Sequence, residues 1–204
     1  MRPPSLPVAP RPRAERRRLD PLTKVLGSLA LVAAALAMAA FALMVFGLLK
    51  PFSVPTGGMA PAISPGDLVI MEGFTSRSHR PRRGDVICFK TAGIPQLPPA
   101  QVYVKRVAGE PGEELKIAGG MLYINGTNVV LSNATGVITN LSPPQVFTTP
   151  LQTNLTVPQN CYFLLGDNTT NSFDSRFYGS IPRQNVLGRI VFCYWPPGRI
   201  GRVK

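Results

Sequence analysis

A run of 25 residues without a charged side chain, Val25–Leu49, is the feature of this 204-residue sequence that most restricts its fold. As an α-helix it would be roughly 37 Å long at ~1.5 Å per residue, which exceeds the ~30 Å hydrocarbon core of a bilayer. A cleaved export signal is the alternative, but the apolar region of such a signal is usually only ~7–15 residues long. The length therefore predicts an uncleaved transmembrane anchor over residues 25–49.

Residues 1–24 form a basic arm with seven Lys or Arg, two acidic residues and six Pro. No apolar period runs through this arm, so we expect it to be disordered. Three consecutive Arg (residues 16–18) and Lys24 lie just before the apolar run, and such flanking positive charge stays on the cytoplasmic side. We therefore expect one crossing of the cell membrane, with a cytoplasmic N-terminus, an extracytoplasmic main domain and lipid as a partner. Because the anchor accounts for the basic charge, we expect no nucleic-acid partner.

The residues after the anchor, 50–204, are enough for one domain, and they predict a mainly β fold. Short apolar runs with alternation recur between Gly, Pro and Asn turn signals, and no long helical period is present. The runs are Asp67–Met71, Asp85–Phe89, Val102–Val107, Glu114–Ile117, Met121–Ile124, Cys161–Leu165 and Arg189–Trp195. Asn125-Gly126 predicts a type I′ hairpin turn. Residues 126–157 are rich in Asn, Thr, Ser and Pro, which predicts a long, loosely ordered, loop-rich insertion.

The His and Cys content excludes several kinds of site. His79 is the only His, so no motif that needs two His ligands is available. It lies in a basic, loop-like run, which favours a solvated surface residue over a catalytic one. The three cysteines lie in apolar runs without a CxxC pair, and we favour buried thiols over one disulfide and one free thiol. We expect no metal and no other cofactor.

Without a usable His, hydrolysis would need another general base, and Lys105 is a candidate. A Lys can act as a base when burial in an apolar site lowers its pKa toward the working pH. Lys105 lies within the strand-like run QVYVKRV, on the same strand face as Tyr103 and Val107. Local sequence alone fits equally a Lys on a solvated strand face, so both interpretations stay open at this point.

Five further segments occur in a defined order behind the apolar run. They are Pro55-Thr56-Gly57-Gly58-Met59-Ala60-Pro61 with Pro65-Gly66-Asp67; Arg83-Gly84-Asp85-Val86; Tyr103-Val104-Lys105-Arg106-Val107 with Gly109-Glu110-Pro111-Gly112; Tyr123-Ile124-Asn125-Gly126; and Gly166-Asp167-Asn168 with Asn171-Ser172-Phe173-Asp174-Ser175-Arg176 and Gly179. Together with the anchor they resemble the type I signal peptidase family over about residues 25–195. Each segment alone is a weak signal, whereas all five in order are specific.

The resemblance implies a membrane-anchored, largely β serine endopeptidase that cuts signal peptides from exported preproteins after small residues, with an apolar surface resting on the bilayer. Lys105 matches the family's general base, and Ser172 matches the residue that hydrogen-bonds to that Lys and orients it. Asp174 and Arg176 match a supporting ion pair. Thr56 matches the side-chain donor of the oxyanion hole, which stabilises charge that develops in the transition state.

The sequence departs from the family at the nucleophile. The family places a Ser immediately before Met59, and this chain has Gly58 there. Gly58 offers a backbone N–H to an oxyanion hole but no hydroxyl, so the usual acyl-enzyme cannot form. One interpretation is an endopeptidase that uses another hydroxyl, such as that of Thr56, or a water. The second, which we favour, is a silent relative that binds signal peptides or regulates an active signal peptidase. The third is a β domain whose motifs are inherited structure only.

Overall fold

The structure, a computed structural model, describes residues 20–46, 48–73, 80–133, 136–138, 141 and 153–203. Most of the predicted disordered arm, His79 and parts of the predicted insertion lie outside the described residues. The chain divides into two compact units, one up to Ala42 and one from Leu43 onward.

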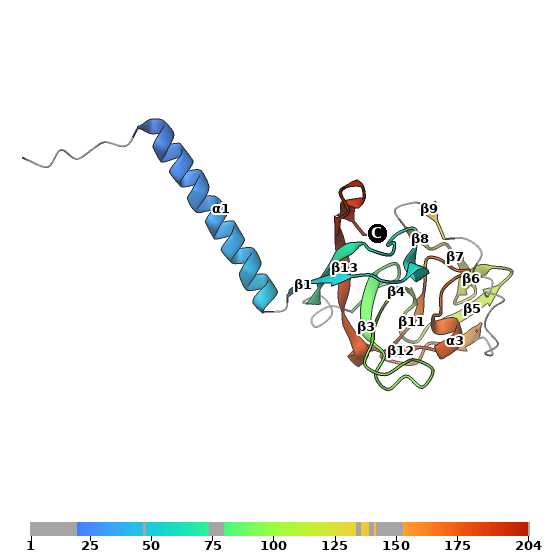
Figure 1. Cartoon of the computed structure of the whole chain (residues 1–204). Coiled ribbons are helices and arrows are strands. Elements are labelled where there is room, and N and C mark those ends of the chain that lie inside the picture. Colours follow the sequence, from blue (N-terminus) through green and yellow to red (C-terminus); the bar gives the residue numbers. More distant parts are fainter. Residues whose placement is uncertain are drawn as a thin grey trace, which may run out of the picture. The chain divides into compact units, whose positions relative to one another are not determined.

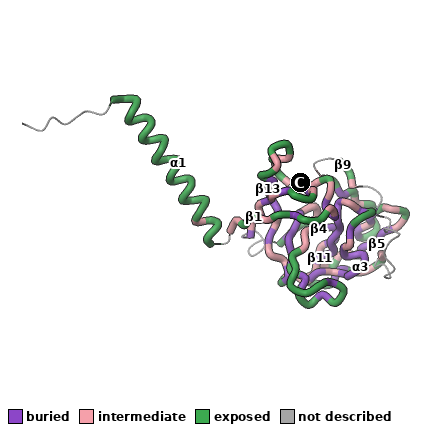
Figure 2. The backbone as a smooth tube through the Cα atoms, in the orientation of Figure 1, coloured by how far each residue is buried: buried purple, intermediate pink, exposed green. Residues whose placement is uncertain are grey.

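The first unit contains most of helix α1, Pro21–Val45, which has no buried residue (Figure 2). It is long and apolar enough to cross a membrane, and no other helix in the described ranges is. It begins and ends four residues earlier than the predicted span 25–49. Pro21 suits the first helical position, because a backbone N–H there has no acceptor within the helix and Pro lacks that N–H. Residues 21–24 are therefore helical rather than disordered, and Leu49 begins a strand.

The second unit is built mainly of antiparallel strands (Figure 1), which confirms the predicted fold class. Its larger sheet has eight strands in the order β1-β2-β13-β3-β4-β11-β12, and β14 also pairs with β13. These strands are β1 (Leu49–Ser53), β2 (Leu68–Glu72), β3 (Val86–Lys90), β4 (Val102–Gly109), β11 (Cys161–Leu165), β12 (Ile181–Pro182), β13 (Val186–Trp195) and β14 (Gly201–Arg202). Four short helices accompany them: η1 (Gly57–Met59), α3 (Ser175–Tyr178), η2 (Arg183–Asn185) and η3 (Pro197–Arg199).

A four-stranded sheet in the order β10-β5-β6-β7 and a separate pair, β8 with β9, complete the unit. Their strands are β5 (Glu114–Ala118), β6 (Met121–Ile124), β7 (Thr127–Val129), β8 (Ser132–Asn133), β9 (Gly136–Val137) and β10 (Asn154–Thr156). The turn between β6 and β7 has φ of 51° at Asn125 and 78° at Gly126. Positive φ at both central residues is the conformation of the predicted type I′ turn.

Three clusters of buried apolar side chains form the core, which Figure 2 shows as the purple interior of the domain. One cluster includes Leu131, Leu141 and Val157, all from or next to the segment predicted to be a loosely ordered insertion. The described part of that segment also supplies β7 to β10. The prediction of loose order is therefore wrong for these residues, because their apolar side chains are buried against the four-stranded sheet.

Candidate functional site

A cleft of about 510 Å³ opens between the chain that follows β1 and the first half of β4. Its lining is mostly apolar. Among the described lining residues Lys105 is the one Lys or Arg, and no carboxylate is present. The lining residues are Phe52, Ser53, Val54, Pro55, Thr56, Gly57, Gly58, Met59, Gln101, Val102, Tyr103, Val104, Lys105, Asn171 and Phe173.

One wall of the cleft is the turn that carries the predicted nucleophile position. Thr56 is extended, with φ of −118° and ψ of 150°, and the chain then turns through η1 with Gly58 and Met59 buried. Asn168 holds this turn in two places, because its backbone N–H donates to O of Gly58 and its side-chain amide donates to O of Gly57, both at 3.2 Å. Thr56 is exposed and lines the cleft.

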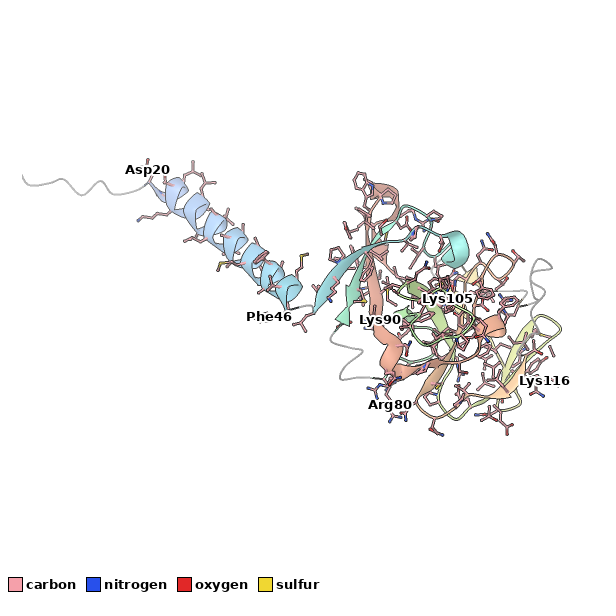
Figure 3. The ribbon with its side chains drawn as sticks, turned by 60° about the horizontal axis from the view of Figure 1, so that its bottom comes forward. Asp20, Phe46, Arg80, Lys90, Lys105 and Lys116 are labelled. Atoms are coloured by element: carbon pink, nitrogen blue, oxygen red, sulfur yellow. The ribbon has the colours of Figure 1, made fainter. Side chains whose placement is uncertain are left out.

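Lys105 lies in β4 opposite Ile87 of β3, and only 6% of its surface is exposed. Figure 3 places it among the strands of the domain, whereas Lys116 lies at the periphery. Burial lowers the pKa of its amine below 10.5, and the charge of Arg176 lowers it further, while Asp174 and Asp167 oppose the shift. The interpretation of Lys105 as a solvated strand residue is therefore wrong.

Lys105, Gly58 and Ser172 lie close together, and the first two line the cleft. A Cβ placed on Gly58 would lie 2.8 Å from Nζ of Lys105 and 3.7 Å from Oγ of Ser172. Nζ of Lys105 thus lies against the space where a nucleophile's side chain would begin. Oγ of Ser172 is buried and has no hydrogen-bond partner. The hydrogen bond from Lys105 to Ser172 that the resemblance implies is therefore absent here, since Nζ lies toward Gly58 instead.

The ion pair expected between Asp174 and Arg176 is present and buried, with side chains 0% and 1% exposed. Nε of Arg176 donates to Oδ1 of Asp174 at 2.8 Å and Nη2 donates to Oδ2 at 2.9 Å. The same carboxylate accepts the backbone N–H of Gly166 at 3.1 Å, and Arg176 also donates to O of Leu141 and Thr169. This pair fixes the segment that carries Ser172 to the end of β11.

A second buried ion pair joins Arg106 to Asp167, two residues that were not among the predicted site residues. Nε and Nη2 of Arg106 donate to the two carboxylate oxygens at 2.8 and 2.6 Å, and both side chains are almost wholly buried. Asn133 donates to the same carboxylate at 3.0 Å. Asp167 directly precedes Asn168, so the pair supports the residue that holds the Gly57-Gly58 turn. The Gly166-Asp167-Asn168 motif marks Asp167 as a candidate site residue, but no local pattern links it to Arg106.

The remaining candidates are accounted for by the geometry. Cys88, Cys161 and Cys193 are all free thiols. Cys88 and Cys193 are buried as predicted, whereas Cys161 is only partly buried, so the expectation of three buried thiols holds for two of them. The described residues contain no group of three or more His, Cys, Asp or Glu placed to hold a metal ion.

Together these features define a protein with an N-terminal helix long and apolar enough to cross a membrane and a β domain that carries a buried Lys in a mostly apolar cleft. The family described as "Signal peptidase, peptidase S26" matches residues 26–195. The chain belongs to this family.

Two sequence relatives agree with this assignment. "Signal peptidase I" of Leptolyngbya laminosa is 33% identical over 98% of this chain and 91% of its own length. "Probable signal peptidase I-2" of Synechocystis is 32% identical over 72% of this chain and 64% of its own length. A solved signal peptidase I from Enterococcus faecalis is 28% identical and covers 54% of this chain and 96% of its own, with a TM-score of 0.37.

Proposed function

We propose that the β domain binds the signal peptides of exported preproteins in the cleft and does not run the Ser–Lys acyl transfer of its family. The observation that carries this proposal is the geometry at Gly58. No hydroxyl stands at the nucleophile position, and Nζ of Lys105 lies 2.8 Å from where a Cβ would begin. Lys105, which matches the family's general base, lies beside this position, and the hydroxyl that it would activate is missing.

Two unpaired strand edges support the binding of an extended peptide. Within the described residues β1 is the end strand of its sheet and pairs only with β2. Residues Val102–Lys105 of β4 pair with β3 on one side, and the pairing of β4 with β11 begins only at Arg106. A peptide between these edges can add as a strand through main-chain hydrogen bonds. The apolar lining suits the small, uncharged residues that precede a signal-peptide cleavage site.

Thr56 is poorly placed to replace the missing Ser. Thr56 itself is extended and lies two residues before Gly58, and the chain turns into η1 between them, so the two positions are at most roughly 6–7 Å apart, the span of an extended chain. The Thr56 side chain is exposed, whereas Gly58 is buried. Attack on a carbonyl needs the reacting atoms ~3–3.5 Å apart. The exposed Thr56 hydroxyl suits an oxyanion-hole donor, as the resemblance implies, together with the backbone N–H of Gly58.

The basic arm supports the orientation proposed for the anchor. The Arg residues at 16–18 and Lys24 precede or open α1, and positive charge of this kind stays in the cytoplasm. The β domain then lies on the outer face of the cell membrane, where exported preproteins present their signal peptides.

A cleavage assay with the full-length chain in detergent or lipid tests the proposal. We expect the unaltered chain to leave a preprotein uncut, Gly58→Ser to cut it, and Gly58→Ser with Lys105→Ala to be silent. No positive φ is recorded for Gly58, so a side chain there is not strained, and Nζ of Lys105 has to move only slightly. Cleavage by the unaltered chain that is lost in Lys105→Ala would show that another nucleophile operates and would overturn the proposal.

A further inference from the structure

The space beside Gly58 is bordered by Nζ of Lys105, Oγ of Ser172 and the backbone O of Asn171, which lie 2.8, 3.7 and 3.8 Å from where a Cβ would stand. Nζ of Lys105 carries up to three N–H groups, and Oγ of Ser172, which is 1% exposed as a residue, has no partner in the structure. The Thr56 hydroxyl lines the same cleft. The two hydroxyls can donate hydrogen bonds to a ligand, and the ammonium form of Lys105 favours a ligand atom that carries negative charge.

Lys105 also lacks a counter-ion of its own. Within the described part of the chain it takes part in none of the salt bridges, and both nearby carboxylates are already paired: Asp174 with Arg176, and Asp167 with Arg106. A buried ammonium without a partner is costly, so a bound anion would stabilise the charged form of Lys105.

We propose that the preferred ligand is a signal peptide that has already been cut, whose C-terminal carboxylate lies beside Gly58 and pairs with the Lys105 ammonium. This inference rests on the proposed function and narrows its ligand from preproteins to the product of their cleavage. The reaction that supplies this ligand is hydrolysis of a peptide bond after a small residue by a separate endopeptidase.

The missing side chain explains the preference. A carboxylate has one oxygen more than the peptide carbonyl from which it is made, and the absent CH₂OH group at position 58 leaves room for it. An uncut preprotein would instead bring a peptide N–H to the same place. That N–H is a donor, so it cannot pair with the ammonium of Lys105, and its only acceptors among the described border atoms are uncharged oxygens. The site therefore discriminates between acid and amide by charge as well as by space.

The experiment is a set of binding titrations on the full-length chain in detergent micelles, with three synthetic probes. The first is a signal peptide that ends in Ala with a free carboxylate, the second is its C-terminal amide, and the third continues past the cut by several residues. We expect the acid to bind about ten- to a hundredfold more tightly than either other probe, as one charge-assisted hydrogen bond contributes.

Two variants assign the preference to the site. Lys105→Met removes the ammonium, so we expect the acid to lose its advantage while the amide still binds and reports an intact cleft. Gly58→Ala fills the space beside Nζ and should reduce the same advantage. Lys116→Gln is the matched control, because it removes an exposed charge in β5 without touching the cleft, and it should leave the preference unchanged.

The outcomes separate the two levels of the proposal. Equal binding of acid and amide, or tighter binding of the extended peptide, overturns the product preference and leaves signal-peptide binding standing. An acid preference that persists in Lys105→Met also overturns this assignment, because a group other than Lys105 would then bind the carboxylate. If none of the three peptides binds the unaltered chain, the proposed function itself fails.

Discussion

Asp174→Ala is the substitution whose effect follows most directly from the structure. The Asp174 carboxylate is 0% exposed and accepts hydrogen bonds from Nε, Nη2 and the backbone N–H of Arg176, and from the backbone N–H of Gly166. Its removal leaves the Arg176 guanidinium, 1% exposed, without its counter-ion. Breaking one partner of a buried ion pair costs about 3–5 kcal/mol. We therefore expect the free energy of unfolding of the β domain to fall by about that amount.

The assay is thermal unfolding of the full-length chain in detergent, followed by circular dichroism of the β domain. For a domain of this size each 1 kcal/mol shifts the Tm by about 2–4 °C, so Asp174→Ala should lower it by about 6–20 °C. The control is Glu72→Gln, which removes one carboxylate from the pair with Arg189 at the surface, where the side chains are 30% and 37% exposed. Exposed pairs contribute about 0–1 kcal/mol, so its Tm should fall by less than about 4 °C. Equal shifts in the two variants would refute the reasoning that burial makes the Asp174 pair essential.

Gly166→Ala places a Cβ 2.1 Å from Oγ of Ser172, so overpacking should lower the free energy of unfolding by about 1–3 kcal/mol in a urea titration. The control Gly198→Ala, whose Cβ would have no atom within 4 Å, should leave the free energy of unfolding unchanged. Because the pKa of Lys105 is lowered by burial, the unfolded chain binds more protons between that lowered value and 10.5. The free energy of unfolding should therefore rise with pH through this window relative to Lys105→Met, as measured by urea titrations at several pH values. Burial raises the pKa of Cys88 to about 12, so alkylation of the folded chain followed by mass spectrometry should label Cys161 first and leave Cys88 unmodified.

The sequence predicted the strands well and their burial less well. The alternation between turn signals located β2 to β6, β11 and β13 within a few residues, because each strand lies between strong turn residues. It missed β1, since Leu49 ends the apolar run that was assigned to the anchor. It also missed β7 to β10, where the polar composition hid Leu131, Leu141 and Val157, which are buried in the core.

The site could be predicted as a set of residues but not as a geometry. Local alternation put Lys105 and Arg106 on opposite faces of β4, with one face free to meet solvent. Both are buried, because β4 lies between β3 and β11 and its second half is covered on both faces. The partner of Arg106 is 61 residues away in sequence, and no local pattern identifies Asp167 as that partner.

The buried Lys105 is the feature that a silent site must explain. Desolvation destabilises the charged form of its amine. In a Ser–Lys enzyme this cost is offset by function, because the Lys activates the Ser hydroxyl. Here the surroundings stay fully built: Asn168 holds the Gly57-Gly58 turn, and two ion pairs fix the chain around it. A domain that served only as a structural scaffold would be more stable with an apolar residue at position 105. The ammonium of Lys105 lies beside Gly58 and has no counter-ion among the described residues. A bound carboxylate would stabilise it, and a cut signal peptide supplies that carboxylate.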